Sequence, residues 1–244
     1  MSAFDLIDDI LEYERQHGPQ AAGTVGEGVL RKIVELSPKP LRYSAETGTG
    51  KTTVLLSHLA DHHLCFTLDD RGVPRGSLDF VQNCPQLRSD KITFVIGPTQ
   101  RTLPSYRFSH MIDLALIDGA HGYPFPEMDY YFLYPHLRAG ALLIVDDIQI
   151  PTIRRLAEFL SEDEMFEQIH VEGNTAFFRR TTAETFDPEA DGWFIQRFNT
   201  NRYKPDAPPT LGLRIRIRRK LRTLAQKFSP RLVDLYSRSK TRRR

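Results

Sequence analysis

The chain has 244 residues, which suffices for one sizeable α/β domain with extensions. Its 40% hydrophobic and 26% charged content is typical of a globular protein, and the lack of any run of about 18 apolar residues excludes a membrane-spanning helix. The formal net charge of +2 hides an asymmetry, because residues 210–244 hold 13 of the 33 Lys and Arg residues and only one of the 31 acids. The acidic N-terminus lacks the pattern of a secretion signal, so we expect a cytoplasmic protein.

The hydrophobic pattern predicts helices and strands that alternate along most of the chain. Residues 1–20 are predicted to form an amphipathic N-terminal helix, and residues 27–36 a second helix. The predicted strands are apolar runs bounded by turn residues, at 42–46, 63–70, 91–98, 111–120, 140–147, 165–171 and 175–181. The predicted helices between them lie at 51–60, 76–84, 126–137 and 151–163, with an irregular link through Pro104.

This order predicts an α/β fold with a doubly wound, mostly parallel seven-stranded sheet that is Rossmann-like. The last two strands are joined by only three residues, EGN at 172–174, which is too short for a crossover helix. They must therefore pair as a C-terminal antiparallel hairpin, with one reversed strand at the edge of the sheet. Ligands of such sheets bind beyond the carboxyl ends of the strands, where the strand order reverses.

The segment AETGTGKTT, residues 45–53, links the first predicted strand to the next helix and fits two kinds of nucleotide site. Ala45-x4-Gly50-Lys51-Thr52 resembles a phosphate-binding loop with alanine at its first glycine, and the strand LLIVDD would supply an aspartate near magnesium. Glu46-x-Gly48-x-Gly50 is instead typical of a nucleoside-binding turn, where glycines let the backbone approach the ligand.

The nucleoside interpretation also accounts for an acid at the end of the next strand. A carboxylate that binds the ribose hydroxyls is expected about 20 residues beyond the glycines. Asp69 follows Gly48 by 21 positions, and its neighbour Asp70 could take the role instead. A phosphate-binding enzyme does not need this acid, so the nucleoside interpretation explains more residues.

Together, AETGTGKTT, the strand end TLDD and the segment from IDGAHGY to LLIVDD make the chain resemble class I S-adenosylmethionine-dependent methyltransferases. Within that class it is most similar to small bacterial enzymes whose fourth strand ends in Ile-Asp-Gly-x-His-x-Tyr. The resemblance implies S-adenosyl-L-methionine as cofactor, bound by Glu46, Gly48, Gly50, Asp69 or Asp70, and Asp118. It divides the chain into an N-terminal helix at 1–20, a methyltransferase domain at 21–182, an extension and linker at 183–209, and a basic tail at 210–244.

Three aspartates end the fourth and fifth predicted strands: Asp118, Asp146 and Asp147. If these strands are neighbours, the carboxylates converge at the mouth of the pocket, and hard oxygen ligands suit Mg²⁺. The chain resembles catechol-type and macrolide-sugar O-methyltransferases, which implies these three residues as metal ligands, with His121 as catalytic base beside Asp118. The alternative is that the aspartates only cap helices or orient loops, and that His121 only binds backbone.

We therefore expect O-methylation of a small-molecule or glycan hydroxyl, assisted by magnesium. Two other functions stay open: a triphosphatase that uses AETGTGKT with LLIVDD, and a non-catalytic cofactor-binding protein. The aromatic side chains of residues 123–134 either line an acceptor pocket or pack their helix against the sheet. The sequence leaves the oligomeric state unknown.

The basic tail, residues 210–244, needs its own explanation. Its apolar residues recur close to one helical face with Lys and Arg around the rest, which is typical of helices that lie on anionic membrane surfaces. The protein would then be peripheral at the inner membrane surface. A solvated extension or contact with another polyanion fits as well, but nucleic acid is disfavoured because no reading motif occurs upstream.

Overall fold

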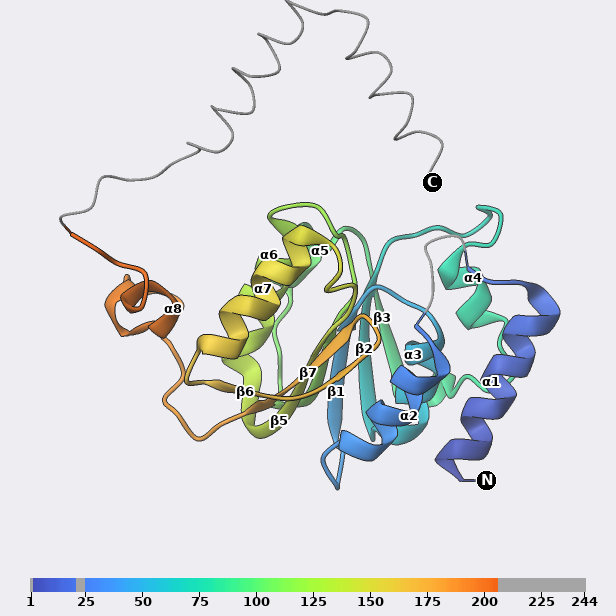
Figure 1. The fold of residues 1–244 in the computed structure, drawn as a ribbon. Helices are drawn as coiled ribbons and strands as arrows, with labels where there is room; N and C mark the ends of the chain where they lie inside the picture. The colour runs from blue at the N-terminus through green and yellow to red at the C-terminus, as the bar shows by residue number, and fades with distance from the viewer. Residues whose placement is uncertain (1, 21–24, 206–244) are drawn as a thin grey trace, which may run out of the picture. The chain divides into compact units, whose positions relative to one another are not determined.

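The computed structural model describes residues 2–20 and 25–205 (Figure 1). The described residues up to Arg202 form one compact unit. The predicted basic tail at 210–244 lies outside the described residues.

All strands of the described chain belong to one seven-stranded sheet in the order β3-β2-β1-β4-β5-β7-β6. Their bounds are β1 Tyr43–Thr47, β2 His62–Thr67, β3 Ile92–Ile96, β4 Ile112–Ile117, β5 Leu137–Val145, β6 Phe166–Glu172 and β7 Thr175–Arg180. The first five strands are parallel, and β7 is antiparallel to both of its neighbours. The predicted doubly wound α/β fold is confirmed, and its order reverses between β1 and β4.

One prediction about the sheet is wrong: the reversed strand does not lie at the edge. β7 lies between β5 and β6, so β6 forms the edge. The reason is burial, because Phe177 and Phe178 of β7 are fully buried, whereas most residues of β6 are exposed or half-buried. The more apolar strand of the hairpin takes the inner position.

The helices are α1 Ala3–His17, α2 Glu27–Leu36, α3 Lys51–Leu59, α4 Ser77–Gln82, α5 Thr99–Ser105, α6 Phe125–Leu133, α7 Pro151–Glu162 and α8 Arg197–Thr200. Short 3₁₀ turns occur at Ser89–Lys91, Tyr134–His136 and Trp193–Ile195. The sequence predicted an irregular link where α5 forms. Pro104 is the penultimate residue of α5, so its missing N–H removes only one helical hydrogen bond.

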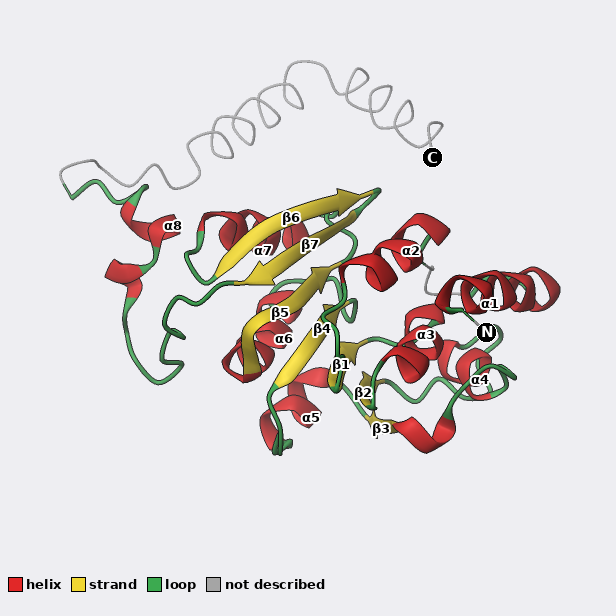
Figure 2. Ribbon diagram, turned by 90° about the horizontal axis from the view of Figure 1, so that it is seen from below, coloured by secondary structure: helices red, strands yellow, loops and turns green. Residues whose placement is uncertain are grey.

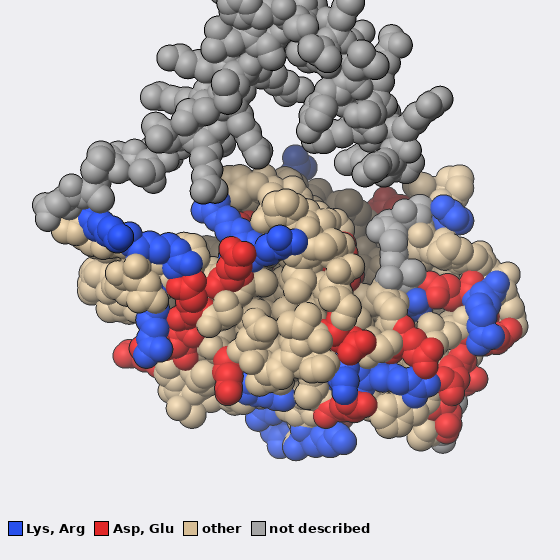
Figure 3. All heavy atoms as spheres, viewed as in Figure 1, with Lys and Arg blue, Asp and Glu red and all other residues tan. Residues whose placement is uncertain are grey.

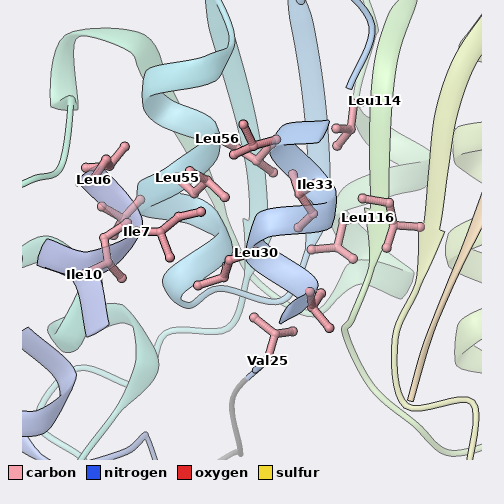
Figure 4. Close-up of a cluster of buried hydrophobic side chains, with 14 of the residues drawn as sticks. Leu6, Ile7, Ile10, Val25, Leu30, Ile33, Leu55, Leu56, Leu114 and Leu116 are labelled. Atoms are coloured by element: carbon pink, nitrogen blue, oxygen red, sulfur yellow. The ribbon is translucent and has the colours of Figure 1, made fainter. Parts of the chain in front are cut away.

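The core consists of two layers, one on each face of the sheet (Figure 2). Successive residues of β4 alternate between them: Leu114 and Leu116 face α1–α3, whereas Ala115 and Ile117 face α5–α7. Figure 4 shows the first layer, where side chains of α1 and α3 lie against those of α2 and β4. Both faces of β4 are therefore covered, which explains its continuous apolar sequence.

The N-terminal helix is an integral part of this core. Ser2 caps α1, since its hydroxyl accepts a hydrogen bond from Asp5 N and the Asp5 carboxylate accepts one from Ser2 N. Ile7 and Ile10 of α1 are fully buried in the layer with α2 and α3. The sequence division at residue 20 therefore does not mark a separate packing unit.

The surface of the described chain carries charges of both signs. On the face shown in Figure 3, Lys and Arg side chains are intermixed with Asp and Glu side chains. No helix among the described residues is long and apolar enough to span a bilayer.

Candidate active site

A cavity of about 490 Å³ opens at the carboxyl ends of the strands, on both sides of the point where the strand order reverses. The turns that follow β1, β2, β3, β4 and β5 all contribute to its lining. This is the place predicted for a ligand, and the volume falls in the range of small-molecule and cofactor sites.

The turn after β1 consists of Gly48, Thr49 and Gly50, and Gly48 lies closest to the neighbouring strand. Its φ of +91° is rarely adopted by other residues, and a Cβ at this position would lie 2.1 Å from the backbone oxygen of Asp118. Gly48 N donates to the backbone oxygen of Phe66. Glycine is therefore required here for the ends of β1 and β4 to meet, and Gly48 lines the cavity as predicted.

Glu46, which was predicted to bind the cofactor, does not line the cavity. The side chain is 1% exposed and lies behind the turn. Its carboxylate accepts hydrogen bonds from the hydroxyls of Thr52 and Thr53, and His63 Nε2 lies 3.1 Å away. Thr53 Oγ1 also accepts from Gly50 N. Glu46 thus fixes the first turn of α3 against β1 and supports the cofactor turn from behind.

The phosphate-loop interpretation fails on geometry. Residues 45–47 belong to β1, so only three residues separate the strand from α3, and no loop is left to wrap a phosphate. Lys51 is 3% exposed and its Nζ lies 2.7 Å from Glu14 Oε2. Gly50 has an extended φ of 177° and does not line the cavity.

The two acids after β2 occupy different positions. The strand ends at Thr67, so both lie in the following loop. Asp69 is ion-paired with Arg71, which holds its pKa at about 2, and does not line the cavity. Asp70 lines the cavity and accepts hydrogen bonds from the backbone N–H groups of Ser77 and Leu78 at the start of α4. The geometry favours Asp70 over Asp69 as the ribose-side acid.

The ends of β4 and β5 bring together Asp118, His121 and Asp147. His121 Nε2 lies 3.4 Å from Asp147 Oδ2 and 3.8 Å from Asp118 Oδ1, and all three side chains remain about one-third exposed. Burial raises the pKa of Asp118 to about 7, and the charges of Asp146 and Asp147 act in the same direction. The Asp118 carboxylate in turn raises the pKa of His121. The cluster can hold and exchange a proton near neutral pH.

Asp146 differs from the other two predicted metal ligands. It is 8% exposed, its Oδ1 accepts a hydrogen bond from the Thr175 hydroxyl, and burial raises its pKa. Within residues 2–20 and 25–205, the one group of three potential ligands comprises Asp118, His121 and Asp147, whose ligand atoms lie within 4.8 Å of one another. Asp146 lines the cavity but does not belong to this group, which includes His121 instead.

The loop after β3 is a part of the cavity that the sequence analysis missed. Gly97, Pro98, Thr99 and Gln100 all line it. No acid follows β3, so the search for strand-end carboxylates passed over this loop. The signal was present nonetheless, since β3 was predicted to be parallel to β2 and its carboxyl end must lie at the same edge of the sheet.

A second residue that the sequence analysis missed is Asp129 of α6, which lies beneath the cavity. It is 1% exposed, and a Cβ on Gly119 would lie 2.9 Å from its Oδ2. Neither Oδ atom has a well-formed hydrogen bond within the described chain. Burial raises the pKa of Asp129 to about 6, against the opposing effect of the Thr99 and Thr47 hydroxyls.

The aromatic residues between 123 and 134 divide between the two predicted roles. Tyr130 and Tyr134 are buried, and their rings stack with centroids 5.0 Å apart, so they pack α6 onto the sheet. Phe125 lines the cavity instead. Tyr123 is 64% exposed, with the guanidinium of Arg155 over its ring.

Comparisons with known proteins agree with this geometry. Residues 45–148 match the family model described as a methyltransferase domain. That segment runs from β1 to just beyond Asp147 and includes the loops after β1, β2, β3 and β4. A search of curated protein sequences found no match.

Three solved structures illustrate the likeness in fold. An O-methyltransferase from Streptomyces achromogenes involved in tomaymycin synthesis, in complex with S-adenosylmethionine, has 14% identity and a TM-score of 0.54, covering 72% of this chain and 90% of that one. An O-methyltransferase from Bacillus cereus in complex with S-adenosylhomocysteine has 12% identity and a TM-score of 0.55, covering 72% and 91%. An S-adenosylhomocysteine-bound methyltransferase from Podospora anserina has 14% identity and a TM-score of 0.55, covering 72% and 88%. With the family match, they confirm the predicted resemblance to class I methyltransferases.

Proposed function

We propose that this chain is an S-adenosylmethionine-dependent methyltransferase that methylates a hydroxyl of a small-molecule or glycan acceptor. The observation that carries the proposal is the cavity at the strand-order reversal, which lies within the segment that matches the methyltransferase domain. No finding supports the triphosphatase interpretation, and the buried Glu14–Lys51 pair argues against it.

The cofactor would occupy the part of the cavity between the turn after β1 and the loops after β2 and β3. Gly48 lets the backbone approach the ligand, and Asp70 faces the same space. Gln100 and Thr99 line the far side and offer polar groups to a purine. Glu46 acts indirectly by holding the turn in shape.

The acceptor would meet the cofactor beside Asp118 and His121. Attack by a hydroxyl requires removal of its proton, and a positioned base contributes typically about 10²- to 10⁴-fold to such a step. We assign this role to His121, whose pKa is raised by the carboxylates of Asp118 and Asp147. The Thr152 hydroxyl donates to the backbone oxygen of His121 and holds its loop in place.

A divalent cation is compatible with the same group. Two carboxylates and one imidazole whose ligand atoms lie within 4.8 Å of one another fit a small divalent ion, and the oxygens suit Mg²⁺. Bound there, the ion would lower the pKa of an acceptor hydroxyl. Asp118 and Asp147 would then be the principal ligands, because His121 cannot hold a metal and accept the proton with the same nitrogen. Asp146, held by Thr175, would orient this end of β5.

The metal proposal is tested with Asp118→Ala. We expect this variant to lose metal-dependent turnover while its affinity for S-adenosylhomocysteine changes little, because the cofactor turn is separate from the carboxylate. Turnover equal to that of the wild type, measured with and without magnesium, would contradict a metal site at Asp118.

The first experiment is calorimetric titration with S-adenosylhomocysteine and, separately, with ATP and magnesium. Micromolar binding of the first and none of the second supports methyl transfer, and the reverse contradicts it. A non-catalytic cofactor-binding protein would bind S-adenosylhomocysteine, show no response to metal and give no product in an acceptor screen.

Two further parts of the proposal concern location. We propose that the protein is cytoplasmic and that residues 210–244 bring it to an anionic surface, because 13 of these residues are Lys or Arg. Sedimentation with anionic and with neutral vesicles tests this. Equal binding to both would contradict an electrostatic role for the tail.

A further inference from the structure

The N-terminal helix α1 contacts both structural elements that shape the cofactor side of the cavity. The ring of Tyr13 lies against Phe80 of α4, with centroids 5.0 Å apart, and α4 begins at the backbone groups that bind Asp70. One residue later, Glu14 pairs with Lys51, the first residue of α3 after the glycine turn. The last turn of α1 therefore connects the loop after β1 with the loop after β2.

The Glu14–Lys51 pair is largely removed from solvent. The two side chains are 15% and 3% exposed, and Lys51 Nζ lies 2.7 Å from Glu14 Oε2. Removing one partner of such a pair leaves the other charge buried without compensation, which is strongly unfavourable. Because Lys51 directly follows Gly50, the direction of its side chain fixes the start of α3 and with it the end of the turn.

A second residue, Gln20, which follows α1, also lies close to the turn. Gln20 is 5% exposed, and its Oε1 lies 3.0 Å from where a Cβ on Gly50 would be. Glu14 Oε1 and Gln20 Nε2 have no hydrogen-bond partner within the described chain, so neither side chain is bound by a second polar group there. Two residues from outside the segment that matches the methyltransferase domain thus lie next to the turn and the start of α3.

We propose that α1 is a clamp on the cofactor turn, with Glu14 as the positioning residue, and that docking of α1 and binding of the cofactor stabilise each other. The inference rests on the proposed function, because it takes S-adenosylmethionine as the ligand of the turn. Such coupling is reciprocal: if the docked helix raises the affinity for the cofactor, the cofactor must stabilise the docked helix by the same factor.

The reciprocal effect can be measured on the unaltered protein. Hydrogen exchange of the backbone amides of residues 3–17 should slow by about fivefold or more when S-adenosylhomocysteine is saturating. The amides of β6, which does not line the cavity, serve as the internal reference. Saturating binding without slower exchange in α1 would overturn the inference and leave the proposed function intact, whereas no binding at all would contradict the proposed function itself.

Variants then identify the residue. Glu14→Gln should weaken binding of S-adenosylhomocysteine by about tenfold, a typical coupling between sites. Glu12→Gln is the matched control. Glu12 lies on the same helix and is half-exposed, and its one ion-pair partner among the described residues is Arg15. It should bind within about twofold of the wild type. Equal losses in both variants would overturn the role of Glu14, as would unchanged affinity of Glu14→Gln.

A charge exchange separates positioning from general destabilisation. Glu14→Lys alone should bind S-adenosylhomocysteine poorly, and the double variant with Lys51→Glu should recover most of the affinity because the pair is restored in reverse. Failure of the double variant to bind better than Glu14→Lys, in preparations that are folded by circular dichroism, would contradict the ion pair as the clamp. If neither variant folds, the exchange measurement on the wild type decides.

Discussion

The turn after β1 and the ends of β4 and β5 both carry residues that look functional in the sequence, yet they differ in how their polar groups are used. At the turn, Glu46 and Lys51 are buried and paired with partners inside the protein. At the strand ends, Asp118, His121 and Asp147 are about one-third exposed and share charges that do not cancel. The first region is therefore built to hold its shape, whereas the second keeps polar groups accessible from the cavity, as the proposed chemistry requires.

The physical reason lies in the cost of burying charge. A buried ionised group must be neutralised or hydrogen-bonded, and its polar atoms are then largely unavailable for binding a ligand. Groups left incompletely paired at a cavity have shifted pKa values and remain able to bind a proton, a metal or a substrate. Four experiments test this distinction, and the one with the strongest expected effect comes first.

Replacing His121 tests the chemical region most directly. His121→Asn should lower turnover by about 100- to 10,000-fold, since a general base of this kind contributes that much. Affinity for S-adenosylhomocysteine should stay within about threefold, because the glycine turn is untouched. The measurement is single-turnover methyl transfer alongside calorimetry. Turnover within a factor of a few of the wild type would assign His121 to the shaping region instead.

Replacing Gly48 tests the shaping region. Gly48→Ala places a Cβ 2.1 Å from the Asp118 oxygen, at a φ of +91°. The expected loss is about 2–4 kcal/mol of unfolding free energy and roughly 100-fold in cofactor affinity, from overpacking and backbone strain together. Chemical denaturation and calorimetry measure the two effects.

Gly50→Ala is the matched control for that substitution. Its added Cβ meets only the end of the flexible Gln20 side chain, at 3.0 Å, and the backbone φ there is ordinary. We expect a cost of less than about 1 kcal/mol. Equal losses at both glycines would mean that the turn needs flexibility at each position rather than a close approach at one.

Asp129 sharpens the comparison, because it is buried yet unpaired. Its pKa rises from 3.8 to about 6 in the folded protein, so the folded state binds the proton more tightly than the unfolded state. The contribution of Asp129 to the free energy of unfolding should therefore fall as pH rises from about 4 to about 6, by up to about 3 kcal/mol, and stay level above that.

Asp129→Asn cannot ionise and should lose this pH dependence. Denaturation of both proteins at pH 4, 5, 6 and 7 gives the two profiles. Parallel profiles would show that Asp129 keeps an ordinary pKa in the fold, and that the Thr47 and Thr99 hydroxyls satisfy its charge.

The smallest effect concerns the two acids after β2. Asp69→Asn should change affinity for S-adenosylhomocysteine by less than about twofold, since Asp69 forms an exposed pair with Arg71. Asp70→Asn should weaken it by about five- to tenfold, through the lost anchor on α4 and the lost carboxylate in the cavity. A larger effect at Asp69, measured by calorimetry, would reverse the assignment.

Local pattern accounts for what could be predicted from the sequence. The alternation of apolar runs with amphipathic helices predicted the sheet, because strands buried on both faces must be apolar throughout. The acids at the ends of β4 and β5 were predicted to converge because parallel neighbours end at one edge. The strand order within the hairpin could not be predicted, since it depends on which of β6 and β7 is the more buried.

Contacts between distant segments account for what could not be predicted. Nothing local relates Glu14 to Lys51, which are 37 residues apart. Glu46 has the spacing of a ligand-binding acid, and its contacts with Thr52 and Thr53 of α3 and with His63 of the neighbouring strand show that its carboxylate is bound internally. Asp129 was within reach of prediction, because residues 126, 129, 130 and 133 form the inward stripe of α6.

The contact between Gly48 and the backbone oxygen of Asp118 has a consequence for how such a protein can diverge. The turn after β1 and the residue that follows β4 approach so closely at this point that no side chain fits between them. Because the facing atom of residue 118 is a backbone oxygen, no change of side chain at 118 relieves the constraint on position 48, whereas Phe125 lines the same cavity without it. Descendants of this chain should therefore keep glycine at 48 while position 125 changes.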